Sequence, residues 1–197
     1  VTLSTNTRTA MIDFLSFCNR LSPLDKEASE DLLRKLKTRT IEKNDFILKR
    51  GEVCRHLCFV DEGLTKTFFT SEDKEFVMRF FAEHSMLTVL DSFVSEMPSN
   101  YGMLALEKTR VTYISKPDLE QLCAKHHCVE TFFRKLVSMA AANMMKRVSE
   151  MLEDNATARY NHFVANEGQL LQRISLGDLS NYLGVTQVTL SRIRAKK

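Results

Sequence analysis

The chain has 197 residues and a mass of 22.7 kDa, enough for one large domain or two small ones. Hydrophobic residues make up 44% and charged residues 27%, with only 6 Gly and 3 Pro, so the composition excludes a disordered or collagen-like chain and predicts a packed core. The longest apolar stretches fall short of the roughly 18 residues that a membrane span needs, and no secretory signal is evident, so we expect a cytoplasmic protein with no membrane partner.

Positive charge is concentrated at one end of the chain. The net charge is +3, and residues 170–197 alone carry five basic residues against Asp178, a local charge of +4. A basic terminus on a nearly neutral body indicates a polyanionic partner, although a solvated tail gives the same pattern. The odd count of 5 Cys favours a reducing compartment over a disulfide scaffold.

The first part of the chain changes from helical to strand-like spacing. Residues 24–36 place leucines at helical intervals and predict a short amphipathic helix. From residue 39 to about 115, short β-rich runs are separated by turn residues such as Gly51 and Gly63. Strands at this spacing, with no long helix between them, predict an antiparallel roll or sandwich.

Helical spacing returns at Pro117, which suits the first turn of a helix, and a longer helical pattern covers residues 129–154. Its apolar residues extend over more of the helix surface than a single stripe, so other elements must pack against the helix on more than one side. We expect one side to lie on the β domain and another to pair with a second copy of the chain; burial within one monomer is the alternative. The predicted dimer contacts are Phe133, Leu136, Ala140, Met144 and Val148.

The segment from Ile174 to Lys197 has the pattern of two short helices joined by a turn. Gly184 permits the turn, Ser180 is small enough for the helices to approach, and Thr186 can cap the second helix. Apolar residues occupy the positions of a miniature core: Leu179, Leu183, Val185, Leu190 and Ile193. This is the pattern of a DNA-binding helix-turn-helix.

The second of these helices is expected to present polar and basic side chains to double-stranded DNA. Arg192 can bond guanine or phosphate, Gln187 can read adenine, and Val188 can contact a thymine methyl group. The predicted contact set is Thr186, Gln187, Val188, Thr189, Ser191, Arg192, Arg194, Lys196 and Lys197. An ordinary helical hairpin with a solvated basic face is the alternative. Because one such unit rarely binds tightly, we expect a dimer on two half-sites.

A β-roll, a long helix and a terminal helix-turn-helix, in that order, resemble the Crp/Fnr family of bacterial transcription factors. The resemblance covers almost the whole chain and is carried by FILKRGEVCRHLCFVDEGLTKTFF, ALEKTRVTYISKPDLEQL and GVTQVTLSRIR. It implies an α+β chain: an antiparallel β-roll, or jelly roll of the cyclic nucleotide-binding type, in residues 1–128, a dimerisation helix in 129–154 and a helix-turn-helix domain in 155–197. It also implies a homodimeric transcriptional regulator, with RNA polymerase and a small-molecule effector as further partners.

The resemblance fails where family members that bind cyclic AMP hold the nucleotide. They carry Gly-Glu and, ten residues after the Glu, an Arg; Thr88-Val89 and Ser99-Asn100 stand at these places here. No Lys or Arg occurs from Phe80 through Glu107, so a phosphate there would lack a cation. We therefore expect a degenerate effector pocket at Thr88, Val89, Ser99 and Asn100 and an effector other than cyclic AMP. The run from Phe76 to Phe81 is expected in the roll core, with an apolar effector pocket as the alternative.

The cysteines raise a further possibility. Cys54 and Cys58, and Cys123 and Cys128 with the neighbouring histidines His126 and His127, suggest a metal centre, but the spacing does not match compact zinc pairs. We expect ordinary thiols, no metal and no cofactor, and the chain has none of the common enzyme motifs. Two alternatives to a DNA-binding regulator stay open: an effector-binding or protein-interaction module without DNA binding, and a Cys-based metal or redox sensor.

Overall fold

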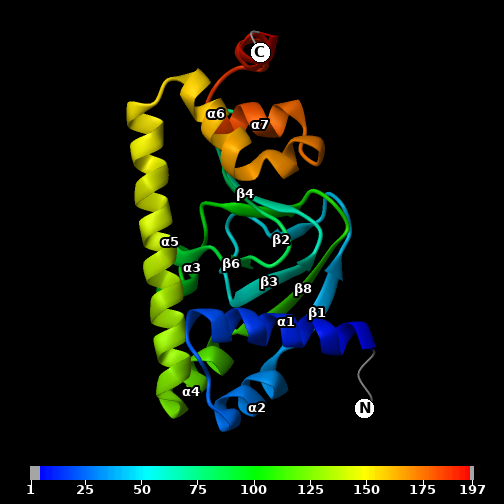
Figure 1. The fold of residues 1–197 in the computed structure, drawn as a ribbon, viewed down its shortest axis with the longest axis vertical. Helices are drawn as coiled ribbons and strands as arrows, with labels where there is room; N and C mark the ends of the chain where they lie inside the picture. The colour runs from blue at the N-terminus through cyan, green and yellow to red at the C-terminus, as the bar shows by residue number, and fades with distance from the viewer. Residues whose placement is uncertain (1–4, 196–197) are drawn as a thin grey trace.

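The computed structural model describes residues 5–195, and Figure 1 shows a β-roll with helices below it, a long helix along one side and further helices above it. The chain begins with α1 (Thr5–Leu21) and α2 (Lys26–Lys35). α2 begins where its composition predicts, because the Asp25 carboxylate accepts a hydrogen bond from the Ala28 N–H at 2.8 Å. The ring of Phe14 on α1 lies 5.8 Å from that of Phe59, so α1 closes one end of the roll core.

Two antiparallel four-stranded sheets form the roll. The first has the order β1-β8-β3-β6, with β1 (Lys37–Ile41), β3 (His56–Glu62), β6 (Met86–Leu87) and β8 (Thr109–Ser115). The second has the order β2-β7-β4-β5, with β2 (Phe46–Leu48), β4 (Thr65–Ser71), β5 (Lys74–Phe81) and β7 (Gly102–Ala105). Gly63, between β3 and β4, has φ +99°, and a Cβ there would lie 2.5 Å from the Thr109 hydroxyl, so only glycine fits this turn.

Three helices lie within and after the roll. α3 (Leu90–Ser95) interrupts the roll between β6 and β7, and α4 (Lys116–Lys125) follows β8 directly, capped by Ser115. α5 (His127–Glu153) then runs along the whole molecule, from the N-terminal helices to the C-terminal ones (Figure 1). Its bounds agree closely with the helix predicted over residues 129–154.

The chain ends in α6 (Ala156–Glu167), a 3-10 turn η1 (Gly168–Gln172), α7 (Leu176–Leu183) and α8 (Gln187–Ala195). These elements share a second hydrophobic core with the outer face of β4 and β5. The ring of Phe80 on β5 lies 6.2 Å from Phe163 and 5.4 Å from Tyr182. The predicted α+β class, with a β-roll, a long helix and a helix-turn-helix, is confirmed.

Candidate nucleic-acid interface and effector cavity

α7, α8 and the turn between them have the geometry of a helix-turn-helix. Gly184 takes φ +67°, a left-handed conformation, and ends α7. The N–H groups of both Gly184 and Val185 donate to the Ser180 carbonyl, the latter at 3.0 Å, so the turn satisfies the last carbonyls of α7. Ser180 is buried at the crossing, and Leu179, Leu183 and Leu190 form the buried centre of this unit.

The start of α8 is fixed by Thr186, whose hydroxyl accepts a hydrogen bond from the Thr189 N–H at 3.1 Å. Beyond it, one edge of the helix is exposed. Of the predicted DNA contacts, Thr189 is half-buried and six are exposed: Thr186, Gln187, Val188, Ser191, Arg192 and Arg194. We call these six the reader edge. Lys196 and Lys197 lie outside the described residues.

A buried ion-pair cluster attaches α7 to the roll. Lys66 on β4 has a side chain only 6% exposed, and its ammonium donates to Glu75 at 2.6 Å and to Asp178 of α7 at 2.7 Å. The amide of Asn181, also on α7, donates to Glu75 at 3.3 Å. Because a buried ammonium needs carboxylate partners, this cluster fixes the position of α7 on the sheet.

A second ion cluster joins Arg173, between η1 and α7, to the edge of the roll. Its guanidinium donates to both oxygens of Glu83, at 2.8 and 2.9 Å, and to both oxygens of Glu107, at 2.7 and 3.0 Å. The guanidinium lowers the pKa of Glu83 to about 2. Two-pronged pairs of this kind orient as well as attract, so the reader edge is held at a fixed angle to the roll.

A cavity of about 360 Å³ lies between the roll and α5. Its walls are mostly apolar, and two polar side chains enter from the neighbouring strands β4 and β5. These are Thr67 and Arg79, which stand directly opposite each other in the antiparallel register. The Thr67 side chain is 9% exposed, and its hydroxyl has no hydrogen-bond partner among the described residues.

Only half of the predicted effector residues line this cavity. Thr88 and Val89 do, but the Thr88 hydroxyl already donates to the His56 carbonyl at 3.1 Å. Ser99 does not, because its buried hydroxyl bonds the backbone of Tyr101, and Asn100 points into solvent. Ser99 and Asn100 are therefore not among the residues that line this cavity.

The premise that this region lacks a cation also needs correction. Arg79 stands one position before the segment from Phe80 to Glu107 in which we found no Lys or Arg, and it lines the cavity from β5. The prediction from sequence considered a cation only in the segment that leads to and follows β6. It therefore missed Arg79, which the pairing of β5 with β4 brings to the cavity.

α5 divides its apolar residues between two sides. Phe133 and Leu136 pack on the roll, with the Phe133 ring 6.1 Å from Phe93, and Ala140 also lines the cavity. Of the predicted dimer contacts, only Met144 and Val148 are exposed. The other large apolar side chains that α5 exposes are Met139, Met145, Met151 and Leu152.

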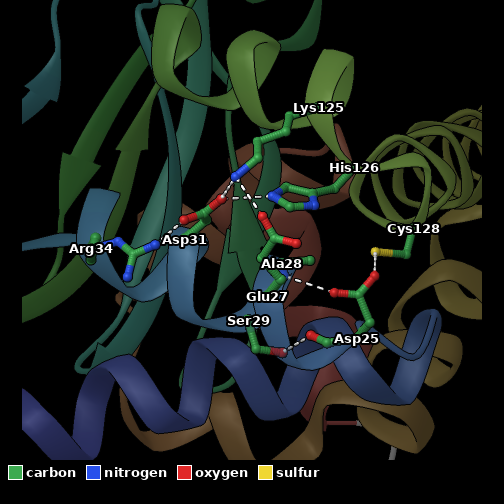
Figure 2. A network of polar contacts seen from close by, with 9 residues as sticks. All are labelled: Asp25, Glu27, Ala28, Ser29, Asp31, Arg34, Lys125, His126 and Cys128. Carbon is green, nitrogen blue, oxygen red and sulfur yellow. Dashed lines mark hydrogen bonds and ion pairs between the residues drawn. The ribbon is translucent and has the colours of Figure 1, made fainter.

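His126 and Cys128, which follow α4, contact different carboxylates (Figure 2). The ring of His126 lies 2.7 Å from Asp31, whereas the Cys128 thiol donates to Asp25 at 3.5 Å. Burial raises the pKa of the Cys123 thiol to about 11, which disfavours the thiolate that metals bind.

Ligand atoms of Glu27, Asp31 and His126 do approach one another within 4.8 Å. The Lys125 ammonium is bound to the same group, 2.7 Å from the carboxylates of both Glu27 and Asp31 (Figure 2). The chain thus supplies its own cation, and the cluster ties α2 to the start of α5.

Comparisons with known proteins agree with this architecture. Residues 38–126 match the family model of the cyclic nucleotide-binding domain. The anaerobic regulatory protein of Pasteurella multocida is 25% identical over 164 residues, which cover 78% of this chain and 60% of that protein. The chain therefore spans less than two thirds of the length of this curated relative.

Solved structures show the same fold. FixK2 from Bradyrhizobium japonicum superposes with a TM-score of 0.71 at 19% identity, over 82% of this chain and 83% of that one. A structure from Eubacterium rectale, assigned to the Crp/Fnr family of transcriptional regulators, superposes with a TM-score of 0.69 at 17% identity, over 86% and 82% of the two chains. No helix among residues 5–195 is long and apolar enough to cross a membrane.

Fold and family model together define a protein with a cyclic nucleotide-binding type of β-roll joined by a long helix to a helix-turn-helix. Residues 38–126 match the cyclic nucleotide-binding domain, and the chain shares its fold with a structure assigned to the Crp/Fnr family, which its sequence motifs resemble.

Proposed function

We propose that this protein is a homodimeric regulator of transcription that binds double-stranded DNA through the reader edge of α8 and catalyses no reaction. The observation that carries the proposal is the free reader edge on an otherwise packed helix-turn-helix. Arg192, Gln187 and Val188 offer a cation, an amide and a methyl surface, which suit guanine or phosphate, adenine and thymine respectively.

The proposal includes a dimer formed through α5. Ala141, Met145, Val148 and Leu152 are all exposed and follow one another at intervals of four, three and four residues. This spacing gives a single coiled-coil seam on the side of α5 away from the roll. The side chains of Met145 and Leu152 are 67% and 81% exposed, an unusual state for such residues unless a partner covers them. We call these four residues the α5 seam.

Further parts of the proposal follow from the family. Residues 1–128 act as the sensor, 129–154 as the dimer helix and 155–197 as the DNA-binding part, in the cytoplasm, with RNA polymerase and a small-molecule effector as partners. The effector is other than cyclic AMP, because Thr88 and Val89 stand where family members that bind cyclic AMP carry Gly-Glu, so the carboxylate that holds the ribose is missing.

Selection of bound sequences from random duplex DNA tests the proposal. We expect a two-fold-symmetric site, with log affinity falling steeply as log salt rises, because each phosphate contact releases counterions. Arg192→Ala should weaken binding by about 1–3 kcal/mol, whereas Arg50→Ala, an exposed arginine on the roll, should not. A selected DNA site without two-fold symmetry, or an affinity for DNA that does not change with salt concentration, would contradict the proposal.

A further inference from the structure

We infer that the cavity between the roll and α5 binds an apolar small molecule carrying one carboxylate, which pairs with Arg79 and accepts a hydrogen bond from Thr67. This inference rests on the proposed function only in treating the bound molecule as the regulator's effector; the binding itself follows from the cavity.

The size and walls of the cavity suit the body of such a ligand. The cavity volume of about 360 Å³ is near the lower end of the range for ligand pockets. About a dozen water molecules occupy the same volume in liquid water. The deep wall comes from Leu57, Phe81 and Leu87 of the roll, and the opposite wall from Phe133, Leu136 and Ala140 of α5. These surfaces offer an apolar ligand burial on both sides but no hydrogen bonds.

Thr67 points to a polar group on the ligand. It lies on β4, an inner strand of its sheet, and its side chain is nine-tenths buried. Its hydroxyl has no partner among the described residues, and leaving such a group unpaired costs free energy. Thr88, which lines the same cavity, differs because its hydroxyl is already bonded to the His56 carbonyl.

Arg79 supplies the matching charge. It stands across the strand pair from Thr67, so both side chains leave the same face of the sheet. Its guanidinium lies 5.1 Å from the Phe81 ring and forms no ion pair with any described carboxylate. Arg79 is an exposed lining residue, and together with the unpartnered Thr67 hydroxyl on the paired strand it supplies the cation and hydrogen-bond donor that a carboxylate requires.

Asp91, which also lines the cavity, does not cancel this attraction. It lies exposed in the first turn of α3, where the free backbone N–H groups offset its negative charge. A cyclic nucleotide fits the same set poorly, because its ribose and ring nitrogens would face leucine, methionine and phenylalanine side chains without partners.

Calorimetric titration of the full chain with decanoic acid, below its micelle concentration, tests the inference. The flexible alkyl chain can adapt to the cavity, and 1-decanol and cyclic AMP serve as the comparison ligands. We expect saturable binding of the acid, with the alcohol bound about tenfold or more weakly and cyclic AMP not bound. Arg79→Met should weaken binding of the acid by about tenfold or more, and Thr67→Val by about threefold to tenfold.

Two controls keep the result clear. Arg50→Met removes an exposed arginine remote from the cavity and should leave binding of the acid unchanged. Thermal unfolding of each variant checks that it folds. The inference is overturned if decanoic acid does not bind, if acid and alcohol bind equally, or if Arg79→Met weakens both alike. Selection of DNA without any added acid is a separate measurement, so failure of acid binding leaves the proposed DNA binding standing.

Discussion

At the scale of single residues, Asp61 on β3 occupies a place where its charge is costly. Burial raises its pKa to about 6, although the Thr112 hydroxyl donates to it at 2.9 Å. Because the folded pKa exceeds the ordinary 3.8, the stability that Asp61 contributes is full below about pH 4 and is lost as pH rises through 6. We predict that Asp61→Asn is more stable than the parent at pH 7 by about 1 kcal/mol, after discounting for partial exposure.

Urea unfolding between pH 4 and 7 measures this difference, which should shrink toward zero at pH 4. Asp118 provides a control of opposite sign: hydrogen bonds from Lys35 and Ser115 lower its pKa, so Asp118→Asn should destabilise the protein by a nearly constant amount between pH 7 and 4, because that contribution is lost only below the ordinary pKa of 3.8. An Asp61→Asn variant less stable than the parent at pH 7 would refute the argument.

Val188 is the reader-edge residue most open to redesign, because its side chain is 60% exposed and contributes nothing to the core. We predict that Val188→Glu leaves the fold unchanged and moves the selected base at one position of each half-site toward cytosine, whose amino group donates to a carboxylate. Parallel selections with parent and variant measure this. An unchanged selected sequence would mean that Val188 does not face the bases.

The reader edge could be predicted from the sequence because its determinants are local. Gly184, Ser180 and the leucines of α7 and α8 lie within some fifteen residues and specify one packing. The cavity could not be predicted in the same way. Arg79 stands opposite Thr67 only through the pairing of β4 with β5, and the Ser99 hydroxyl bonds the backbone of Tyr101, so sequence distance along the loop did not identify the lining residues.

At the scale of elements, α5 shows how an apolar helix can mislead. Periodicity predicted a broad stripe but not which side the roll would cover, and Phe133 and Leu136 turned out to face the roll. The exposed α5 seam lies next to them. We predict that Met145→Lys raises the dimer dissociation constant about a hundredfold or more, because pairing would bury an unpaired ammonium.

Sedimentation equilibrium measures that constant. Met139→Lys is the matched control, since Met139 is exposed on the same helix but lies about 120° around it from Met145 and about half a turn from Val148. Met139→Lys should therefore leave the dimer intact. Equal effects of the two substitutions would remove the α5 seam from the proposal, and a monomeric parent would remove the dimer itself.

At the scale of the whole molecule, β5 connects the cavity with the reader edge. Arg79 and Phe81 face the cavity, whereas Phe80 between them packs on Phe163 and Tyr182 of the C-terminal helices. A ligand that moved the β5 backbone at Arg79 would therefore act on a strand whose other face carries the helix-turn-helix. The ion clusters of Lys66 and Arg173 resist that movement, so they determine how far a local change is transmitted.

The Arg173 cluster makes this resistance measurable. Arg173→Met leaves the carboxylates of Glu83 and Glu107 facing each other without a cation, so we predict a local loss of about 1–2 kcal/mol in amide exchange protection over residues 168–183, while β1 and β8 keep theirs. Arg110→Met, which breaks an ion pair to Glu62 within the roll, should leave residues 168–183 protected.

The dependence on pH separates charge from packing. In the parent, the pKa of Glu83 is lowered to about 2, so its contribution is full above its ordinary 4.5 and is lost as pH falls through 2. In Arg173→Met the sign reverses, because protonation relieves the repulsion between the two carboxylates. Lowering the pH from 7 to 5 should thus restore part of the lost protection in the variant and none in the parent. If the variant shows no such recovery, Arg173 acts through packing, and the two carboxylates do not govern how the helix-turn-helix is attached.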